Sequence, residues 1–347
     1  MLKSKFPIYI AILVSLSSCF KKEEAIQLPI GNSEIKTVFL GKEYEFDTYF
    51  DLGTNAYRQN IRSDWDLRFE TSKDGWGVFI NTESEIVVHK YNMYHLSEPK
   101  TFDSLAIMEM EDLIDKPNGK PEESAFKDWR TYKQGGGASQ LHGIYVIEFK
   151  RRPLKEKFIR VQILNVSDTA YTCRFTPLYD AAGDSILYNN SNFIVKKESN
   201  QNYTYLTFKG GSPNLVPNVE PNKNDWDFVF TRYIEFFDLG SGVILPYPVN
   251  GVKSNKFNVL VARDSVSNFN DIDMTYISRY NFSTNEDAIG YDWKSHAYGA
   301  GGNYSVNSKI AYIIKDTEGY YYKMRFLDFY NDKAEKGYPK FEFVRIK

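Results

Sequence analysis

The sequence predicts a mostly β chain made of two tandem sandwich-type domains that arose by internal duplication. Asp64-Trp65-Asp66 returns as Asp225-Trp226-Asp227, 161 positions later (225 − 64). Asp128-Trp129 returns as Asp292-Trp293, 164 positions later (293 − 129). Landmarks that recur in one order over so long a period indicate two copies of a whole domain, not a short solenoid repeat. The aromatic content of 16% favours strands, where rings pack on a half-buried pleated surface.

Alternation of apolar and polar residues supports strands in both copies. Residues 145–149 and 158–163 form one predicted strand pair, and residues 311–315 and 321–326 form its counterpart in the second copy. The intervening Asp316-Thr317-Glu318-Gly319 is typical of a hairpin loop. We therefore expect antiparallel sheets that pack as sandwiches.

The length of 347 residues and the turn-rich stretches between periodic segments predict the domain limits. Residues 1–19 read as a signal peptide and residues 20–36 as a tether. The first repeat is expected over 37–180, a linker over 181–198, and the second repeat over 199–347.

The N-terminus predicts export and lipidation. A basic start with Lys3 and Lys5 precedes an apolar run that is too short to span a bilayer. Leu16-Ser17-Ser18-Cys19 resembles the lipobox of bacterial lipoproteins, in which the cysteine is acylated and holds the protein on a membrane. The charged residues 20–24 resemble a surface-export tag, so we expect an outer-membrane lipoprotein that faces the cell exterior. The alternative is an ordinary secretory signal with a coincidental cysteine.

Composition argues against several function classes. The net charge of −2 with mixed signs leaves no electrostatic footprint for nucleic acid. With Cys19 lipidated, Cys173 has no disulfide partner, and its strand-like surroundings predict a buried structural thiol. No zinc-type Cys/His spacing or nucleophile motif occurs, so we predict neither a structural metal site nor an enzyme.

The Asp-Trp-Asp motifs have two interpretations. On a strand, carboxylates two apart share one face and could do acid–base chemistry, as in a hydrolase. However, glycoside cleavage needs opposed carboxylates, which one strand face does not supply. The favoured interpretation is structural: the tryptophans anchor the core and the aspartates tie down neighbouring turns. The residues assigned this role are Asp64, Trp65, Asp66, Trp129, Asp225, Trp226, Asp227 and Trp293.

Histidine and methionine supply the candidate ligands for haem iron or copper. His89, Met93 and His95 would share one strand face together with Tyr91, although this pattern also fits an exposed polar face. Met274 and His296 form a second candidate pair in the second repeat.

The second repeat resembles the HmuY-like family, the haem-binding lipoproteins of Bacteroidetes. The strings that carry the resemblance are Asn224-Asp225-Trp226-Asp227-Phe228, Tyr247-Pro248-Val249, Tyr291-Asp292-Trp293-Lys294 and Lys323-Met324-Arg325-Phe326-Leu327. The first repeat resembles the family more weakly, because it keeps only the Asp-Trp motifs.

The resemblance implies a β-rich lipoprotein that binds haem and passes it to a TonB-dependent outer-membrane receptor. It also implies two axial His or Met ligands on hairpins that follow the Asp-Trp-Asp strand, which here points to Met274 and His296, with His89, Met93 and His95 as runners-up. The alternative function is a surface interaction module that binds glycan or a protein partner without haem.

Overall fold

The structure is a computed structural model of the chain. It describes residues 33–82, 85–91, 110–132, 138–140, 143–180, 182–184, 186, 191–296 and 302–346. The predicted signal peptide with Cys19, most of the predicted tether, and Met93 and His95 lie outside these residues.

The described residues fold mostly into strands, as predicted. In the first part of the chain these are β1 (Glu34–Thr37), β2 (Phe46–Asp51), β3 (Ala56–Ile61), β4 (Leu67–Glu70), β5 (Val78–Ile80), β6 (Ile86–Tyr91), β7 (Arg130–Tyr132), β8 (Ala138–Gln140), β9 (Ile144–Phe149), β10 (Phe158–Val166) and β11 (Ala170–Pro177). The rest are β12 (Phe193–Lys196), β13 (Tyr203–Thr207), β14 (Asn214–Val216), β15 (Phe228–Asp238), β16 (Ile244–Ser254), β17 (Leu260–Asp264), β18 (Lys294–His296), β19 (Tyr304–Val306), β20 (Ala311–Lys315), β21 (Tyr321–Tyr330) and β22 (Lys336–Arg345).

Within the described residues, helical structure is limited to short turns. These are α2 (Leu154–Lys157) and the 3-10 helices η1 (Arg62–Asp64), η3 (Pro121–Glu123), η4 (Lys127–Trp129), η5 (Phe269–Asp271) and η6 (Met274–Arg279). None of the helices in the described part of the chain has the length and apolarity that crossing a bilayer requires.

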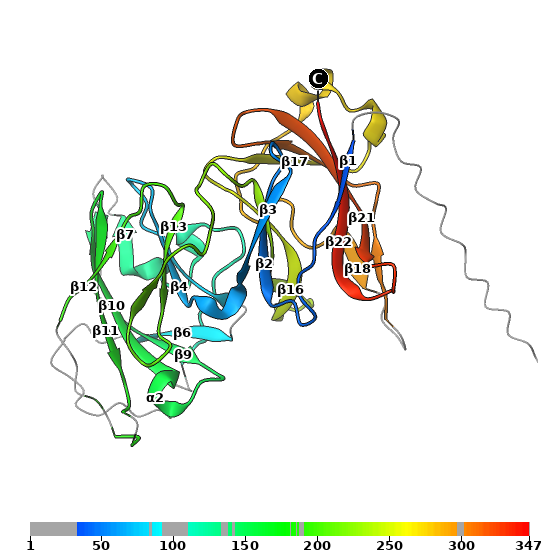
Figure 1. Cartoon of the computed structure of the whole chain (residues 1–347). Coiled ribbons are helices and arrows are strands. Elements are labelled where there is room, and N and C mark those ends of the chain that lie inside the picture. Colours follow the sequence, from blue (N-terminus) through cyan, green and yellow to red (C-terminus); the bar gives the residue numbers. More distant parts are fainter. Residues whose placement is uncertain are drawn as a thin grey trace, which may run out of the picture.

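The strands form matching sets of sheets in two lobes (Figure 1). Lobe 1 holds the sheets β12-β11-β10-β9-β6, β14-β13-β4-β5 and β7-β8. Lobe 2 holds β1-β22-β21-β20-β17, β16-β15-β2-β3 and β18-β19. Each strand of one lobe has its counterpart eleven strands away in the other, so the duplication read from the sequence is also a duplication of topology.

The two repeats exchange their first three strands. In lobe 2, β2 of the first repeat pairs with β15 of the second, with Phe50 opposite Phe228. In lobe 1, β13 of the second repeat pairs with β4 of the first, with Leu206 opposite Leu67. Figure 1 shows the consequence, since the blue strands β1–β3 lie among the orange and red strands of lobe 2.

This exchange corrects the predicted domain limits. The linker predicted over 181–198 contains β12, which pairs with β11, and the tether predicted over 20–36 runs into β1, which pairs with β22. Both strands are four residues long and lie at sheet edges, so only one side of each is paired. Edge strands of only four residues are too short to show the alternation that identified the longer ones.

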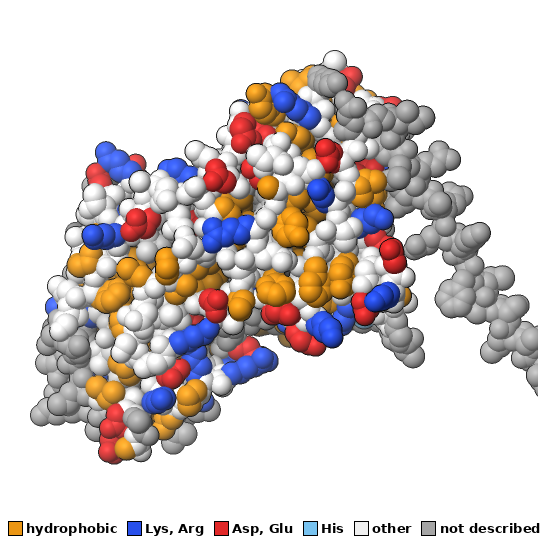
Figure 2. All heavy atoms as spheres, viewed as in Figure 1, with side chains coloured by type: hydrophobic (Ala, Val, Ile, Leu, Met, Phe, Trp, Pro, Cys, Tyr) orange, Lys and Arg blue, Asp and Glu red, His pale blue; other side chains and the backbone are white. Residues whose placement is uncertain are grey.

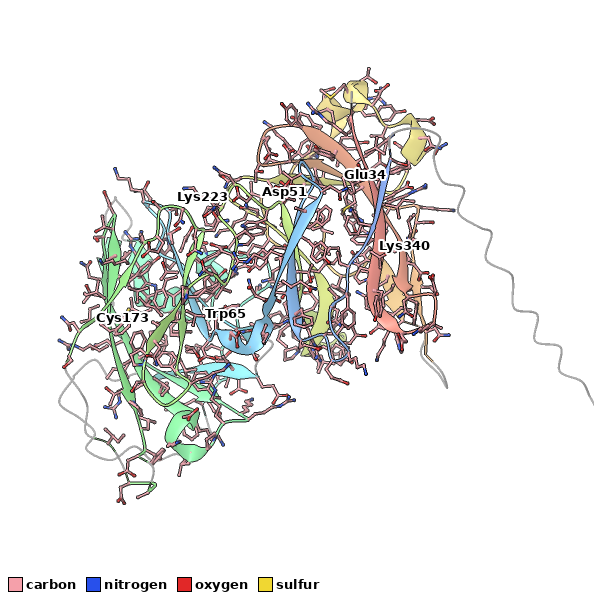
Figure 3. The ribbon with its side chains drawn as sticks, in the orientation of Figure 1. Glu34, Asp51, Trp65, Cys173, Lys223 and Lys340 are labelled. Carbon is pink, nitrogen blue, oxygen red and sulfur yellow. The ribbon has the colours of Figure 1, made fainter. Side chains whose placement is uncertain are left out.

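Each lobe is a sandwich around its own apolar core. In lobe 1 the core joins residues of β4 and β5 to residues of β9–β11, and it includes Cys173, which is fully buried. In lobe 2 the core joins β2 and β15 to β20–β22. Figure 3 places Cys173 inside lobe 1, in agreement with the predicted structural thiol. Burial raises the pKa of this thiol, which keeps it unreactive.

Local details repeat between the lobes as well. The register of β10 shifts between Ile163 and Asn165, and that of β21 shifts between Phe326 and Asp328. A bulge at the same place in both copies is a feature of the fold, because bulges set the twist and aim of a strand. The predicted hairpin loop 316–319 joins β20 to β21, and Gly319 takes the left-handed conformation (φ 89°) that favours glycine.

Candidate functional site

The second aspartate of each Asp-Trp-Asp motif fastens the exchanged strands. Asp66 accepts hydrogen bonds from the backbone N–H of Phe208 (2.6 Å) and the hydroxyl of Thr207 (3.0 Å) at the end of β13. Asp227 accepts from the backbone N–H of Leu52 (2.8 Å), just past the end of β2. Both carboxylates are completely buried. Each motif therefore holds the other repeat's hairpin in place.

The tryptophans of the two Asp-Trp-Asp motifs lie between the lobes. Trp65 packs edge-on against Tyr205 (ring centroids 5.2 Å apart), and Trp226 packs edge-on against Tyr49 (5.0 Å). Figure 3 shows Trp65 at the junction of the two lobes. These tryptophans thus pack at the interface between lobes and not in a lobe core, which corrects one part of the structural interpretation.

The motif carboxylates do not share one face. Asp64 is exposed and pairs with Lys209 (3.2 Å), whereas Asp66 is buried. The reason is that the motif precedes the strand: Asp64 ends η1, and β4 begins only at Leu67. The first aspartate of the second motif, Asp225, binds Asn222 in the preceding turn (2.9 Å). A shared acid–base face is therefore absent from both motifs.

Two asparagines complete the motifs. The side-chain amide of Asn81 donates to the carbonyl oxygens of Arg62 and Trp65, and that of Asn255 donates to those of Lys223 and Trp226. The sequence did not single them out because their distances from the Asp-Trp-Asp motif differ, with 15 residues in the first copy (81 − 66) and 28 in the second (255 − 227).

The second tryptophan landmark is a core residue in both lobes. Trp129 and Trp293 are each 1% exposed. Trp293 stacks on Phe326 at 3.9 Å between ring centroids. The preceding aspartates form ion pairs, Asp128 with Lys90 and Asp292 with Arg263, both at 2.6 Å. This arrangement, which the two lobes share, holds a strand of the larger sheet against the loop that carries the tryptophan.

His89 is a buried residue with acidic neighbours. Its side chain is 1% exposed, Nε2 lies 3.2 Å from Glu148 and Nδ1 lies 3.6 Å from Asp112. A ring enclosed in this way does not offer a nitrogen to a porphyrin. Since its predicted companions Met93 and His95 lie outside the described residues, the structure does not assemble that candidate site.

Met274 and His296 do not meet. Met274 begins η6, a turn that belongs to an apolar cluster beside the start of β21, where Phe282 packs on Tyr321. His296 ends β18 and packs on Tyr304, whose backbone N–H donates to the hydroxyl of Tyr330 at the other end of β21. Nine residues of strand separate these ends by about 30 Å. Figure 1 shows the yellow turns beside the C-terminus and β18 at the opposite end of the lobe.

An apolar hairpin projects near His296. Past the core, the β15–β16 hairpin carries five large apolar side chains that are 43–62% exposed. We call them the hairpin tip: Leu239, Val243, Ile244, Leu245 and Tyr247. The β18–β19 hairpin lies against the same strands, since the ammonium of Lys294 donates to the carbonyl oxygen of Asn250 on β16.

Lys294, which shares β18 with His296, is surrounded by aromatic rings. Its Nζ is 4.2 Å from the ring centroid of Trp293, 5.0 Å from that of Phe329 and 5.7 Å from that of Tyr304. Burial lowers the pKa of Lys294 to about 7, with Asp292 opposing the shift. Cation–π contacts thus replace the carboxylate that a buried lysine usually needs.

Charged residues join the lobes at their interface. Glu286 accepts from Arg68 (2.7 Å), Lys253 (3.2 Å) and the hydroxyl of Tyr203 (2.6 Å). Although burial opposes its ionisation, the two cations hold the pKa of Glu286 well below its usual range. Burial also raises the pKa of Glu220 to about 8 and that of Asp115 to about 7. Sequence patterns gave no signal for this network, because its members have no counterpart in the other copy.

Two small cavities adjoin this network. Their volumes are about 50 and 30 Å³, and both are lined by Tyr49, Arg68 and Tyr205. Ligand pockets for drug-sized molecules are about 300–1,000 Å³, so these cavities do not admit a porphyrin. The face drawn in Figure 2 carries interspersed acidic and basic side chains, which gives no single-sign field for nucleic acid.

The second repeat also matches a known family. A family model described as HmuY protein matches residues 199–343, which span β13–β22. This segment of the chain is therefore similar to the HmuY family. The matched segment follows the repeat in sequence and not the lobe in space, because it includes the β13–β14 hairpin that pairs within lobe 1. No curated protein is significantly similar to the chain.

Several solved structures are similar to the chain at low identity. Apo PinO from Porphyromonas gingivitis is 10% identical, covers 91% of this chain and 98% of its own, and has a TM-score of 0.34. The apo HmuY analog from Tannerella forsythia is 11% identical, with coverages of 91% and 96% and a TM-score of 0.24. An HmuY-like heme binding protein from Bacteroides vulgatus is 16% identical, with coverages of 41% and 83% and a TM-score of 0.24.

Proposed function

We propose that the protein is a non-enzymatic surface lipoprotein that binds haem on lobe 2. The observation that carries the proposal is the exposed hairpin tip of β15–β16, whose strand β16 is contacted by the hairpin that bears His296, within the residues that match the HmuY family. A porphyrin is a flat apolar ligand that needs apolar surface and an axial donor. The hairpin tip offers the first and the His296 imidazole offers the second.

The donor set fits one axial ligand. His296 is exposed at the end of β18, whereas Met274 lies at the far end of β21. When bound, haem would supply a redox-active iron with His296 as its protein ligand from the described residues. With a single imidazole ligand we expect a high-spin spectrum. A His/Met pair would instead give a low-spin spectrum.

A haemin titration of residues 20–347, followed by absorbance, tests this function. The wild-type protein is expected to give a saturable Soret shift, and His296→Ala is expected to weaken binding by about tenfold or more, which is 1.4 kcal/mol. Leu245→Ser removes apolar surface at the hairpin tip and is expected to weaken binding as well. Met274→Ala is the matched control, because it alters an equally exposed residue of the same lobe.

Two outcomes would count against the proposal. A flat titration would remove haem binding altogether. Equal affinity for the wild type and His296→Ala would keep haem binding but move the iron ligand elsewhere.

We also propose where the protein is located and which kind of receptor it contacts. Acylation of Cys19 would hold the protein on the outer membrane, facing the exterior, and haem would pass to a TonB-dependent receptor. Mass spectrometry of the membrane-extracted protein tests the lipid, and Cys19→Ser should release the protein into the soluble fraction. Haem transfer from the loaded protein to a purified receptor tests the hand-off.

The alternative is a surface module that binds glycan or protein without haem. The observation that favours it is the exposure of aromatic side chains away from the hairpin tip, with Tyr57 59% and Tyr320 45% exposed. Aromatic rings offer a stacking surface to sugars. Binding on a glycan array, lost in Tyr57→Ala and Tyr320→Ala and accompanied by a flat haemin titration, would favour this function.

A further inference from the structure

Strand β3 is an open edge of its sheet. It comes last in the order β16-β15-β2-β3, so only β2 pairs with it. The backbone N–H of Arg62 donates to the carbonyl oxygen of Glu45, just before β2 (2.9 Å). The alternation along the strand then turns the backbone groups of Tyr57, Gln59 and Ile61 away from β2. These outward N–H and C=O groups bond to none of the residues that the structure describes.

Most other edges of the four larger sheets are short or covered. Unpaired strand edges invite pairing with another chain, and proteins protect them by shortness, by proline or by a covering segment. The edge strands β1, β5, β12 and β14 have only three or four residues each. A bridge to Leu113 covers the outer side of β6, and a bridge to Ser283 covers that of β17.

Proline protects the edges that most resemble β3. On β16, Pro246 and Pro248 are in phase with Val252, whose backbone N–H bonds outward, away from β15 (2.9 Å). These outward positions therefore offer no N–H to another strand. In lobe 1, the counterpart of β3 is β14, which lies between Pro213 and Pro217. By contrast, β3 is six residues long and contains neither proline nor lysine.

Apolar side chains flank the open edge. Tyr57 is 59% exposed and Ile61 is 48% exposed. Ile61 lies opposite Phe46 on β2, Phe46 packs edge-on against Phe39, and Phe39 stacks on Tyr338 of β22 (ring centroids 4.8 Å apart). Figure 2 shows hydrophobic side chains over β2, β3 and β22 on the face that it draws. A partner strand at this edge would bury apolar surface as well as pair backbone groups.

The sequence of β3 is complementary to itself in one antiparallel register. With Gln59 opposite Gln59 of a second copy, Tyr57 of each copy lies opposite Ile61 of the other. The outward residues then meet as hydrogen-bonded pairs, each of which exchanges two backbone bonds. Pairs of an aromatic with a β-branched side chain are favourable cross-strand neighbours.

Charge favours this register over its neighbours. With Gln59 at the centre, Arg58 lies opposite Asn60 of the second copy. Sliding the two strands by two residues in one direction places Arg58 opposite Arg58, and sliding them in the other direction places it opposite Arg62. Like charges that lie directly opposite each other are destabilising.

We propose that β3 pairs with β3 of a second copy of this chain, across a twofold axis at Gln59. The self-complementary register supports a second copy as the partner, because a foreign strand would not need Tyr57 and Ile61 placed symmetrically about Gln59. The pairing uses the one open edge that each copy contributes, so it closes at a dimer. The contact is one strand with the apolar side chains beside it, so we expect a weak dimer with a Kd of about 10 µM.

Sedimentation velocity of residues 20–347 at concentrations up to about 100 µM tests the dimer. The wild type is expected to shift from monomer to dimer as its concentration rises. Ile61→Lys places an ammonium group opposite Tyr57 of the second copy and should weaken dimerisation by about tenfold or more. Leu215→Lys is the matched control, because Leu215 is 50% exposed on the corresponding edge strand β14 and should leave the equilibrium unchanged.

A disulfide at the twofold axis gives a second readout. In the proposed register, Gln59→Cys brings two thiols together on Cα atoms about 5.5 Å apart, which suits a disulfide. Mild oxidation should therefore give a covalent dimer, whereas Leu215→Cys should stay monomeric. Cys173 does not interfere, because it is completely buried and burial raises the pKa of its thiol.

Three results would overturn the proposal. One is a wild type that remains monomeric at about 100 µM. Another is equal weakening by Leu215→Lys and Ile61→Lys, and the third is a failure of Gln59→Cys to cross-link faster than Leu215→Cys. The hairpin tip lies on β15 and β16, away from the β3 edge in the strand order, and none of these assays contains haem. The outcome is therefore independent of the proposed function.

Discussion

Oδ2 of Asp227 accepts a hydrogen bond from the backbone N–H of Leu52, 175 residues away in sequence, at 2.8 Å. Its counterpart joins Asp66 to Phe208 at 2.6 Å. In each case the Asp-Trp-Asp motif of one repeat secures the hairpin of the other. The motif that revealed the duplication thus also hydrogen-bonds each repeat to the exchanged hairpin of the other.

The first prediction concerns Asp66. Asp66→Ala leaves the N–H of Phe208 and the guanidinium of Arg152 without a partner, so we expect a loss of about 3–5 kcal/mol in the free energy of unfolding. Asp64→Ala, in the same motif but at an exposed ion pair, should cost less than about 1 kcal/mol. Urea unfolding followed by tryptophan fluorescence measures both. Equal effects would contradict the fastening role of Asp66.

The second prediction concerns pH and Asp227. Burial, with Asp316 and Asp51 adding to it, raises the pKa of Asp227 to about 7, against about 3.9 in the unfolded chain. Because the folded state retains this proton between these values, stability falls as pH rises from about 4 to about 7, by roughly 4 kcal/mol for this group.

The measurement compares unfolding free energies of the wild type and Asp227→Asn in EDTA at several pH values. Glu220 and Asp115 also have raised pKa values, so only the difference between the two proteins reports on Asp227. The wild type should lose stability relative to Asp227→Asn as pH rises to about 7. Parallel pH profiles would show that Asp227 does not titrate there.

The third prediction concerns the isolated repeats. To pair with its own β4, the β2–β3 hairpin would place β3 parallel to β4, and only five residues, 62–66, connect them. Eleven residues, 217–227, connect β14 to β15. Since connections between parallel strands usually take a dozen or more residues, the second connection is nearly sufficient and the first is not. We therefore expect residues 191–347 to form a monomer and residues 33–180 a strand-exchanged dimer.

Light scattering after size-exclusion chromatography distinguishes these states. Inserting six glycine and serine residues between Ile61 and Arg62 should convert the dimer of residues 33–180 into a monomer. A monomer without the insertion would show that the short connection does not enforce the exchange.

The fourth prediction concerns the interface between lobes. Glu286→Ala leaves Arg68 and Lys253 buried without a counter-ion, so it should cost about 3–5 kcal/mol. Glu235→Ala, a half-buried carboxylate of lobe 2 without an ion pair, is the control and should cost less. Calorimetry should also show whether the loss splits one transition into two. An unchanged single transition at the wild-type Tm would contradict a stabilising role for the network.

The sequence was sufficient to predict what depends on local pattern. Alternation located β20, β21 and the hairpin loop 316–319, and the repeated Trp129 and Trp293 are core residues in both lobes. The exchange of strands was not predictable from this pattern, because β2 alternates in the same way whether its partner is β4 or β15. Whether β2 pairs with β4 or with β15 depends on the length of the connection at residues 62–66. That length can be interpreted only when the strand order of the sheets is known.

Site residues were harder to predict for a similar reason. Met274 and His296 are 22 positions apart in sequence, yet they lie beside opposite ends of β21. The network of Arg68, Lys253 and Glu286 has no repeat signal, since these residues interact across an interface that the pattern of either copy does not describe.

Strand exchange also determines the order in which the two lobes can fold while the chain is being synthesised. The strands β1–β3 emerge first, but their partners β15 and β22 begin only at Phe228 and Lys336. Lobe 1 can close once β14 is made, whereas lobe 2 stays open until the final strand arrives. Such long-range pairing is slow, and it leaves early strand edges available to other chains. A product that stops short of β22 would therefore carry unpaired edges at its beginning and is expected to aggregate or be degraded.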